Sequence, residues 1–185
     1  MKFVTLAAVA AAAFVSSAAS ANDISGFRGE AILGWDQVRL SGEGNKSGFA
    51  YGVGVGYDLP VGETISVGVD AEIAGSTAKL RESLRGEFFE VKAGRDIYVG
   101  GRITGKVADN VAVYAKAGYS NARLSTKSNI AGFDDLSGNG DGFRVGAGAQ
   151  YLLGNGAYVG GEYRYSNYEG DFSRNQVVAT LGYRF

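Results

Sequence analysis

The sequence predicts an all-β protein, an eight-stranded antiparallel up-and-down transmembrane β-barrel. Three observations predict it. Residues alternate between an apolar face and a small or polar face over eight segments, aromatic residues recur eight positions apart on the apolar face, and short links alternate with long polar links. A period of two is the signature of a strand whose two faces meet different surroundings. Beyond position 21, no apolar run approaches the roughly 18 residues of a helical membrane span.

Residues 1–21 are expected to be a cleaved signal peptide, which leaves 22–185 as one barrel domain. A positive charge at Lys2 precedes an alanine-rich apolar run that ends near Val15, the pattern of a secretory signal. The run is too short for a transmembrane helix. A short buried helix at the start of a soluble domain is the alternative. The small residues of the expected cleavage site and the residue that follows it are Ala19, Ala21 and Asn22.

Five segments show the alternation clearly, and three more complete the set. The clear segments are 49–59, 65–73, 143–151, 158–165 and 177–185, and the others are about 27–39, within 88–105, and about 111–123. The length of the segment within 88–105 suggests an extension beyond the membrane. Short links at 60–64, 107–110 and 153–156 alternate with longer polar segments at about 40–48, 76–87, 124–141 and 168–173. That layout is typical of outer-membrane barrels, which have short periplasmic turns and long external loops.

The composition of the two faces favours a membrane barrel over a soluble, lipocalin-like periplasmic barrel. A soluble exterior would be dense in charge with few glycines, whereas the less apolar face here mixes Gly, Ser, Thr and Ala with charges of both signs. Such residues suit a narrow closed interior, where charges must pair. We expect a paired plug because eight strands leave little lumen, and a gated ion path is the alternative. The expected lumen charges are Glu30, Asp70, Glu72, Lys92, Arg102, Lys116, Arg144, Glu162 and Arg164.

Aromatic spacing supports the same choice. Three pairs of aromatic residues lie eight positions apart on one face, which is roughly 26 Å along a strand. With the tilt of a barrel strand this projects to about 20 Å, close to the ~25 Å apolar band that aromatic girdles flank in outer-membrane barrels. The residues expected at the two lipid interfaces are Phe27, Trp35, Phe49, Tyr57, Phe143, Tyr151 and Tyr183.

The C-terminus carries a pattern that resembles outer-membrane β-barrels in general. The last strand alternates to a terminal aromatic through Val177, Ala179, Leu181, Tyr183 and Phe185. In those proteins such an ending is read by the barrel-assembly machinery, so the resemblance implies that machinery, periplasmic chaperones and outer-membrane lipid as partners. The runs YVGGEYRYSNY at 158–168 and VAVYAKAGY at 111–119 resemble the small porin or opacity family of Gram-negative bacteria. The chain is also similar to the OmpA-type transmembrane domain, without the peptidoglycan-binding domain.

The composition argues against chemistry at an active site. The chain has no His and no Cys, whereas the enzymatic families of small barrels rely on histidine. We therefore expect no enzyme, no metal and no cofactor. The net charge of −1 gives no reason to expect nucleic acid. The predicted function is that of a monomeric outer-membrane protein with a structural, envelope-integrity or surface role. The alternatives are a small-solute or ion pore, an adhesin that binds a ligand through its long loops, and the soluble periplasmic barrel.

Overall fold

The computed structural model describes residues 24–40, 44–77, 79–84, 87–128, 137–169 and 172–185. The expected cleavage site at Ala19, Ala21 and Asn22 lies outside these residues, so the signal peptide stays a prediction. In the described part of the chain, no helix has the length and apolar character needed to cross a membrane.

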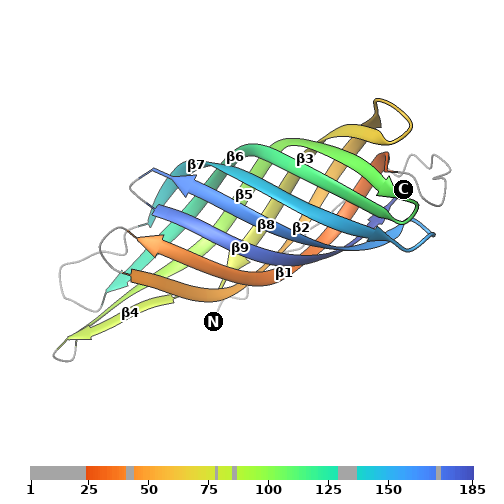
Figure 1. The fold of residues 1–185 in the computed structure, drawn as a ribbon. Helices are drawn as coiled ribbons and strands as arrows, with labels where there is room; N and C mark the ends of the chain where they lie inside the picture. The colour runs from red at the N-terminus through yellow and green to blue at the C-terminus, as the bar shows by residue number, and fades with distance from the viewer. Residues whose placement is uncertain (1–23, 41–43, 78, 85–86, 129–136, 170–171) are drawn as a thin grey trace, which may run out of the picture.

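The described strands form one antiparallel sheet that closes on itself (Figure 1). Their order in the sheet is β3-β2-β1-β9-β8-β7-β6-β5-β4, and a further pairing of β3 with β5 closes the barrel. Eight strands therefore form the wall and β4 lies outside it, which confirms the predicted fold class. The strands are β1 (Gly26–Leu40), β2 (Gly44–Pro60), β3 (Ile65–Ser76), β4 (Lys79–Leu84), β5 (Glu87–Ala108), β6 (Val111–Ser128), β7 (Ser137–Leu152), β8 (Ala157–Tyr168) and β9 (Phe172–Arg184).

The two ends of the barrel differ, as the alternation of short and long links predicts. Short turns join β2 to β3, β5 to β6 and β7 to β8 at the end where the chain terminates (Figure 1). We call this the turn end. The opposite end, here the loop end, is extended by β4 and by the part of β5 that pairs with it (Figure 1). The 22-residue β5 has the extra length expected of the segment within 88–105.

The prediction of long polar loops was wrong in extent. The β1–β2 ladder continues to Leu40 and Gly44, and the β6–β7 ladder continues to Ser125 and Ser137. Within the segment predicted as loop 76–87, residues 79–84 form β4, which pairs with β5. Backbone pairing continues because the ladder bonds are made by the main chain and do not require apolar side chains. Residues 129–136, inside the predicted loop 124–141, are not among the residues that the structure describes.

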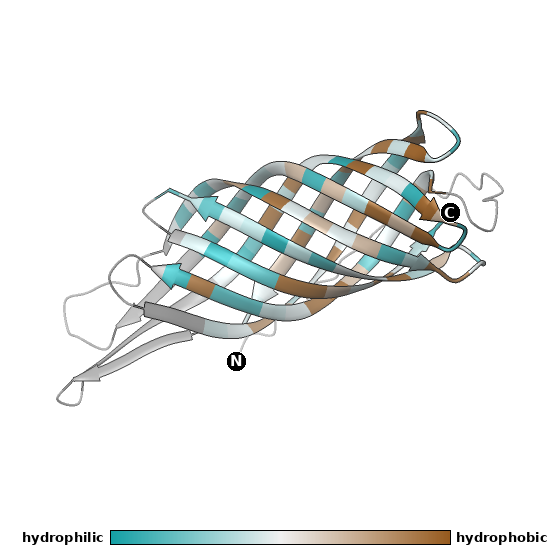
Figure 2. Ribbon diagram, in the orientation of Figure 1, coloured by the Kyte–Doolittle hydropathy of each residue, from teal (hydrophilic) through white to brown (hydrophobic). Residues whose placement is uncertain are grey.

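Hydrophobic and hydrophilic residues alternate along the coloured parts of the wall strands (Figure 2), and their burial alternates with them. In β3, for example, Val69 is 63% exposed, whereas its neighbour Asp70 is 3% exposed. Most large apolar side chains lie on the outside and most charged side chains of the wall on the inside, the reverse of a soluble barrel. Closure also gives each of the eight wall strands two hydrogen-bonded neighbours, which a bilayer requires because it offers no water to unpaired backbone groups.

The predicted interface aromatics lie on the outer face. Register pairs Trp35 with Phe49 near the loop end and Phe27 with Tyr57 near the turn end. Phe143, Tyr151 and Tyr183 are each about half exposed on the same outer face. Their contact with lipid stays a prediction, as does the role of the C-terminal residues in assembly. Of the latter, Val177, Ala179, Leu181 and Tyr183 face outward on β9, and the Phe185 ring lies 5.8 Å from that of Phe27 and 4.9 Å from that of Tyr183.

Candidate functional site in the barrel lumen

The lumen is filled by charged side chains that come from every wall strand. Eight of the nine predicted lumen charges are buried, each at most 6% exposed. They are Glu30, Asp70, Glu72, Arg102, Lys116, Arg144, Glu162 and Arg164. The side chain of the ninth, Lys92, lies outside the described part of the structure.

Six more lumen charges were not predicted. They share the inward face of β1, β2, β5 and β9 and are Arg28, Asp36, Asp58, Asp96, Arg174 and Arg184. Strand parity could have identified several of them, because Arg28 and Asp36 lie an even number of residues from Glu30. Together, the buried charged residues that the structure describes are seven cations and seven anions. The interior is therefore balanced in sign.

At the turn end, Arg28 is the centre of a cluster. Its Nε donates to Asp58 at 2.9 Å, its Nη2 bonds to Asp70, and its Nη1 lies 3.6 Å from Glu30. Arg184 approaches Asp58 from the last strand at 3.3 Å. The cluster joins β3, β2, β1 and β9, four consecutive strands of the wall.

In the middle of the barrel, two carboxylates and two cations form a closed set. Lys116 Nζ lies 2.8 Å from Glu162 and bonds to Glu72, and Arg164 lies 3.0 Å from Glu72 and 2.5 Å from Glu162. The hydroxyl of Tyr114 donates to Glu162 at 2.6 Å. We call Glu72, Lys116, Glu162 and Arg164 the central quartet. It links β3, β6 and β8, which are not neighbours in the sheet, and therefore spans the lumen.

Towards the loop end, Asp96 accepts from several donors. Arg144 and Arg174 both pair with it, the latter at 2.9 Å, while Ser120 and Tyr168 donate hydroxyl bonds of 2.8 and 3.1 Å. Arg174 also pairs with Asp36 at 2.6 Å. Arg144 Nη1 lies 3.5 Å from Glu72, which connects this cluster to the central quartet.

Glycine makes the room that these side chains occupy. A Cβ atom at Gly54 would lie 3.2 Å from the Cγ of Glu30 and 3.3 Å from the Cγ of Glu72. A Cβ atom at Gly146 would lie 3.0 Å from a carboxylate oxygen of Glu162 and 3.3 Å from the Cε of Lys116. Eight strands enclose an interior just wide enough for side chains, so long charged residues on some strands require very small ones opposite.

Arg102 is held differently from the other lumen arginines. Its guanidinium lies 3.6 Å from the ring centre of Tyr114, and its Nε donates to Thr104 at 3.1 Å. The Tyr114 ring and the Thr104 hydroxyl thus provide part of the stabilisation that carboxylates provide to the other lumen arginines. Nη1 and Nη2 of Arg102 have no hydrogen-bond acceptor among the described residues.

The described lumen carboxylates are engaged with cations and hydroxyl groups. Among the residues described, no group of three or more Asp or Glu side chains is placed to hold a metal ion. Glu72 and Glu162 of the central quartet each pair with both Lys116 and Arg164. These ion pairs offset the free-energy cost of burying the two carboxylates away from water. The arrangement can cross-link the barrel wall and obstruct the lumen.

Comparisons with known proteins agree with this architecture. The model of the outer membrane protein beta-barrel domain family matches residues 5–185. Among solved structures, the chain is similar to Ail, the attachment invasion locus protein of Yersinia pestis, with a TM-score of 0.59 and 16% identity over 86% of this chain and 99% of that chain. It is also similar to Neisserial surface protein A, with a TM-score of 0.64 and 18% identity over 87% of this chain and 98% of that chain.

A comparison with curated proteins finds no match. The structural likenesses, at such low identity, show a shared fold. The family match covers nearly the whole chain, and it agrees with a closed wall that is apolar outside and charged inside. The chain belongs to the outer membrane protein beta-barrel family and is a small, multi-pass barrel of the outer membrane.

Proposed function

We propose that this protein is a non-enzymatic, monomeric structural protein of the outer membrane surface, with a lumen closed to solutes by its ion-pair network. The central quartet supports the proposal. Four buried side chains from β3, β6 and β8 meet across the lumen. Lys116 lies 2.8 Å from Glu162, and Arg164 lies 3.0 Å from Glu72 and 2.5 Å from Glu162. Open aqueous pores have about 16 strands, whereas eight strands leave only space for side chains.

Planar-bilayer conductance tests the closed lumen. The refolded full barrel is expected to give no steady channels at moderate voltage. A variant that cuts the central quartet, Arg164→Ala, is expected to give brief openings, because it removes a long side chain and leaves Glu72 and Glu162 with fewer cations. Steady nanosiemens-scale channels from the unmodified protein would contradict the closed lumen and favour the pore.

An envelope role is tested separately. Cells that lack the protein are expected to become more permeable to bulky apolar dyes, and a plasmid copy should restore the barrier. The Arg164→Ala variant should restore it less well if closure matters. Outer-membrane fractionation with a heat-dependent gel-mobility shift would show that each variant is present and folded.

The loop end supports a second candidate, an adhesin or other surface-binding protein. Its ladders project past the barrel wall, with β4 paired to β5 and β5 paired to β6 as far as Ser128 (Figure 1). Ail, which has a similar fold, has been solved in complex with the heparin analogue sucrose octasulfate. The segment 76–87 carries five charged residues, Lys79, Arg81, Glu82, Arg85 and Glu87.

Replacing residues 79–92 with a short turn tests this candidate. The barrel should remain folded, because β3 pairs with β5 only from Ala74 and Asp96 towards the turn end. If binding to heparin beads or to cells is lost while the gel shift is retained, the surface-binding function is supported. Unchanged binding, or none in the parent protein, would count against it.

A further inference from the structure

The mouth of the lumen at the turn end is covered. Inward-facing residues at the very ends of the wall strands would meet water if this mouth were open. Three of them, each the second residue of its strand, are instead 0% exposed: Ser66 of β3, Ala112 of β6 and Tyr158 of β8. Asp58 near the end of β2 and Arg184 at the end of β9 are at most 3% exposed. Another part of the chain therefore lies over the opening.

Ile24, two residues before β1, lies across this mouth. Its carbonyl oxygen accepts a 3.0 Å hydrogen bond from the Ser66 hydroxyl. Its side chain is buried in an apolar cluster with Ala112, Leu152 and Tyr158. These partners belong to β3, β6, β7 and β8, whereas the wall neighbours of β1 are β2 and β9. Because so short a segment leads from β1 to Ile24, the chain reaches these strands only by turning inward over the opening.

Gly26 makes the inward turn. Its φ of +104° lies in the left-handed region, which glycine adopts without steric cost and other residues rarely adopt. A Cβ atom at this position would also lie 2.6 Å from the carbonyl oxygen of Phe185. The Phe185 main chain is itself held by a 2.8 Å bond from its N–H to the carbonyl of Phe27. A residue larger than glycine would therefore change the direction in which the chain leaves β1.

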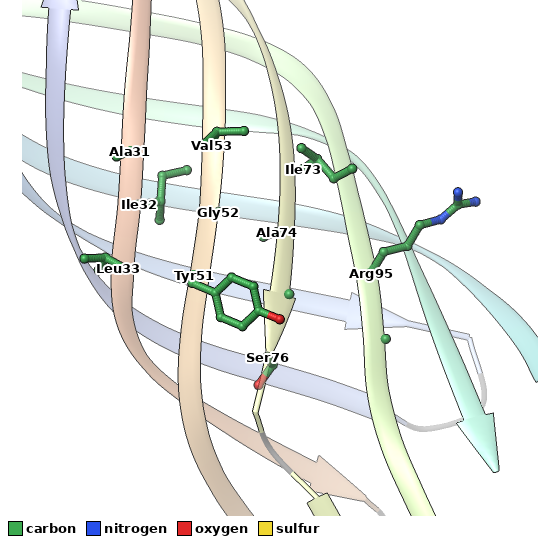
Figure 3. A pocket seen from close by; sticks show the side chains of 12 residues that line it. Ala31, Ile32, Leu33, Tyr51, Gly52, Val53, Ile73, Ala74, Ser76 and Arg95 are labelled. Carbon is green, nitrogen blue, oxygen red and sulfur yellow. The ribbon is translucent and has the colours of Figure 1, made fainter. Parts of the chain in front are cut away.

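A second apolar cluster inside the barrel shows how the position of Ile24 differs from ordinary packing against the wall. Ile32 of β1 is buried with Ala50 of β2 and Val178 of β9. It also lines the groove where the β3–β5 ladder ends (Figure 3). These three residues come from adjacent strands, so their cluster lies against one side of the wall. The cluster of Ile24 instead joins the start of the chain to strands that β1 does not pair with.

We propose that Ile24 caps the turn-end mouth of the lumen and that the bend at Gly26 holds it there. The turn end of an outer-membrane barrel faces the periplasm. The cap is thus a second closure, made by other residues than the central quartet, and it extends the closed lumen of the proposed function to the periplasmic end. It also keeps water from the buried cluster around Arg28, whose ion pairs are stronger in surroundings of low dielectric constant.

Single introduced thiols test the cap, because the chain has no cysteine of its own. Ala112→Cys lies under the cap and Ala122→Cys lies towards the loop end, both buried on the inner face of β6 and on either side of Lys116. The refolded full barrel in detergent micelles, with both ends open to solvent, is treated with a charged methanethiosulfonate reagent. Both thiols should react slowly. Adding Ile24→Ala should speed the reaction at Ala112→Cys about tenfold and leave Ala122→Cys unchanged.

Matched variants separate the cap from general effects. Gly26→Ala should act like Ile24→Ala, whereas Gly29→Ala, whose added Cβ meets nothing within 4 Å, should not. Val61→Ala, which shortens an exposed side chain in the β2–β3 turn at the same end, should also change nothing. A heat-dependent gel shift must show that each variant is folded. An equal effect of Val61→Ala and Ile24→Ala, or of Gly29→Ala and Gly26→Ala, would overturn the cap.

The thiol at position 112 also distinguishes failure of the cap from failure of the central quartet. Fast reaction of Ala112→Cys in the otherwise unmodified barrel, with slow reaction of Ala122→Cys, would overturn the cap alone. Equal acceleration of both thiols by Ile24→Ala would show that the two closures are not independent, which would also overturn it. In planar bilayers, Ile24→Ala with Arg164→Ala should stay open longer than Arg164→Ala alone, because two closures in series must both open. Equal open times would contradict a cap that closes the lumen.

Discussion

The inner and outer faces of the same strands follow opposite rules. On β3, Glu72 is 5% exposed and lies among three cations, whereas the next residue, Ile73, is 52% exposed on the outer wall. Inside, each charge depends on particular partners from distant strands. Outside, the lipid needs only an apolar surface and makes no specific demand on shape. Substitutions should therefore be coupled and costly on the inner face and largely independent on the outer face.

The largest expected effect is at the centre of the network. Glu72→Ala leaves Lys116 and Arg164 buried with fewer anions, and loss of one partner of a buried pair costs about 3–5 kcal/mol. Urea unfolding in lipid vesicles, followed by the fluorescence of the single Trp35, would measure the loss. Ile73→Ala is the control on the outer face. Equal losses in the two variants would contradict the contrast between the faces.

A charge on the outer face should have the next largest effect. Val69 lies midway between Ile65 and Ile73 on the apolar face of β3 and is 63% exposed. Val69→Arg is expected to cost about 2–4 kcal/mol, the range for arginine facing lipid near the bilayer midplane. Val69→Leu should be nearly neutral in the same unfolding assay. If Val69→Arg were also neutral, this surface would not face hydrocarbon.

Replacing a tyrosine by phenylalanine on the inner face and on the outer face gives the most direct comparison of the two faces. Tyr114→Phe removes the 2.6 Å hydrogen bond to buried Glu162, and a bond to a charged group is worth about 1.5–3 kcal/mol. The variant should unfold at a lower urea concentration, and the dependence of its free energy of unfolding on urea should be unchanged. A double variant, Tyr114→Phe with Glu162→Gln, should lose less than the sum of the single losses, because the two residues interact. Additive losses would mean that the bond contributes little.

The smallest effect is expected for the outward tyrosine. Tyr163→Phe removes a 2.7 Å hydrogen bond from the hydroxyl of this exposed tyrosine to Asn175, for which about 0.5–1.5 kcal/mol is expected. Comparison of its unfolding midpoint with that of Tyr114→Phe ranks the two faces directly. A larger loss at Tyr163 than at Tyr114 would reverse the proposed order.

The strand pattern could be predicted because it is local. Alternation of residue types identified the eight wall strands, and the eight predicted lumen charges whose burial the structure describes are all buried. The extension of the ladders could not be predicted in this way. β4 and the loop ends of β6 and β7 are polar, and main-chain pairing at those positions leaves no apolar pattern in the sequence.

The pairing of the lumen charges depends on closure. Tyr158 donates to Glu30 across 128 positions of sequence, and Arg174 meets Asp36 across 138. The sequence by itself determined that the chain forms strands with one apolar and one charged face, because each face requires only a period of two. Only the tertiary structure decided which charges meet and where the β3–β5 ladder ends, at Ala74 and Asp96. Both depend on the register at which the barrel closes, and that register brings together residues from strands far apart in the chain.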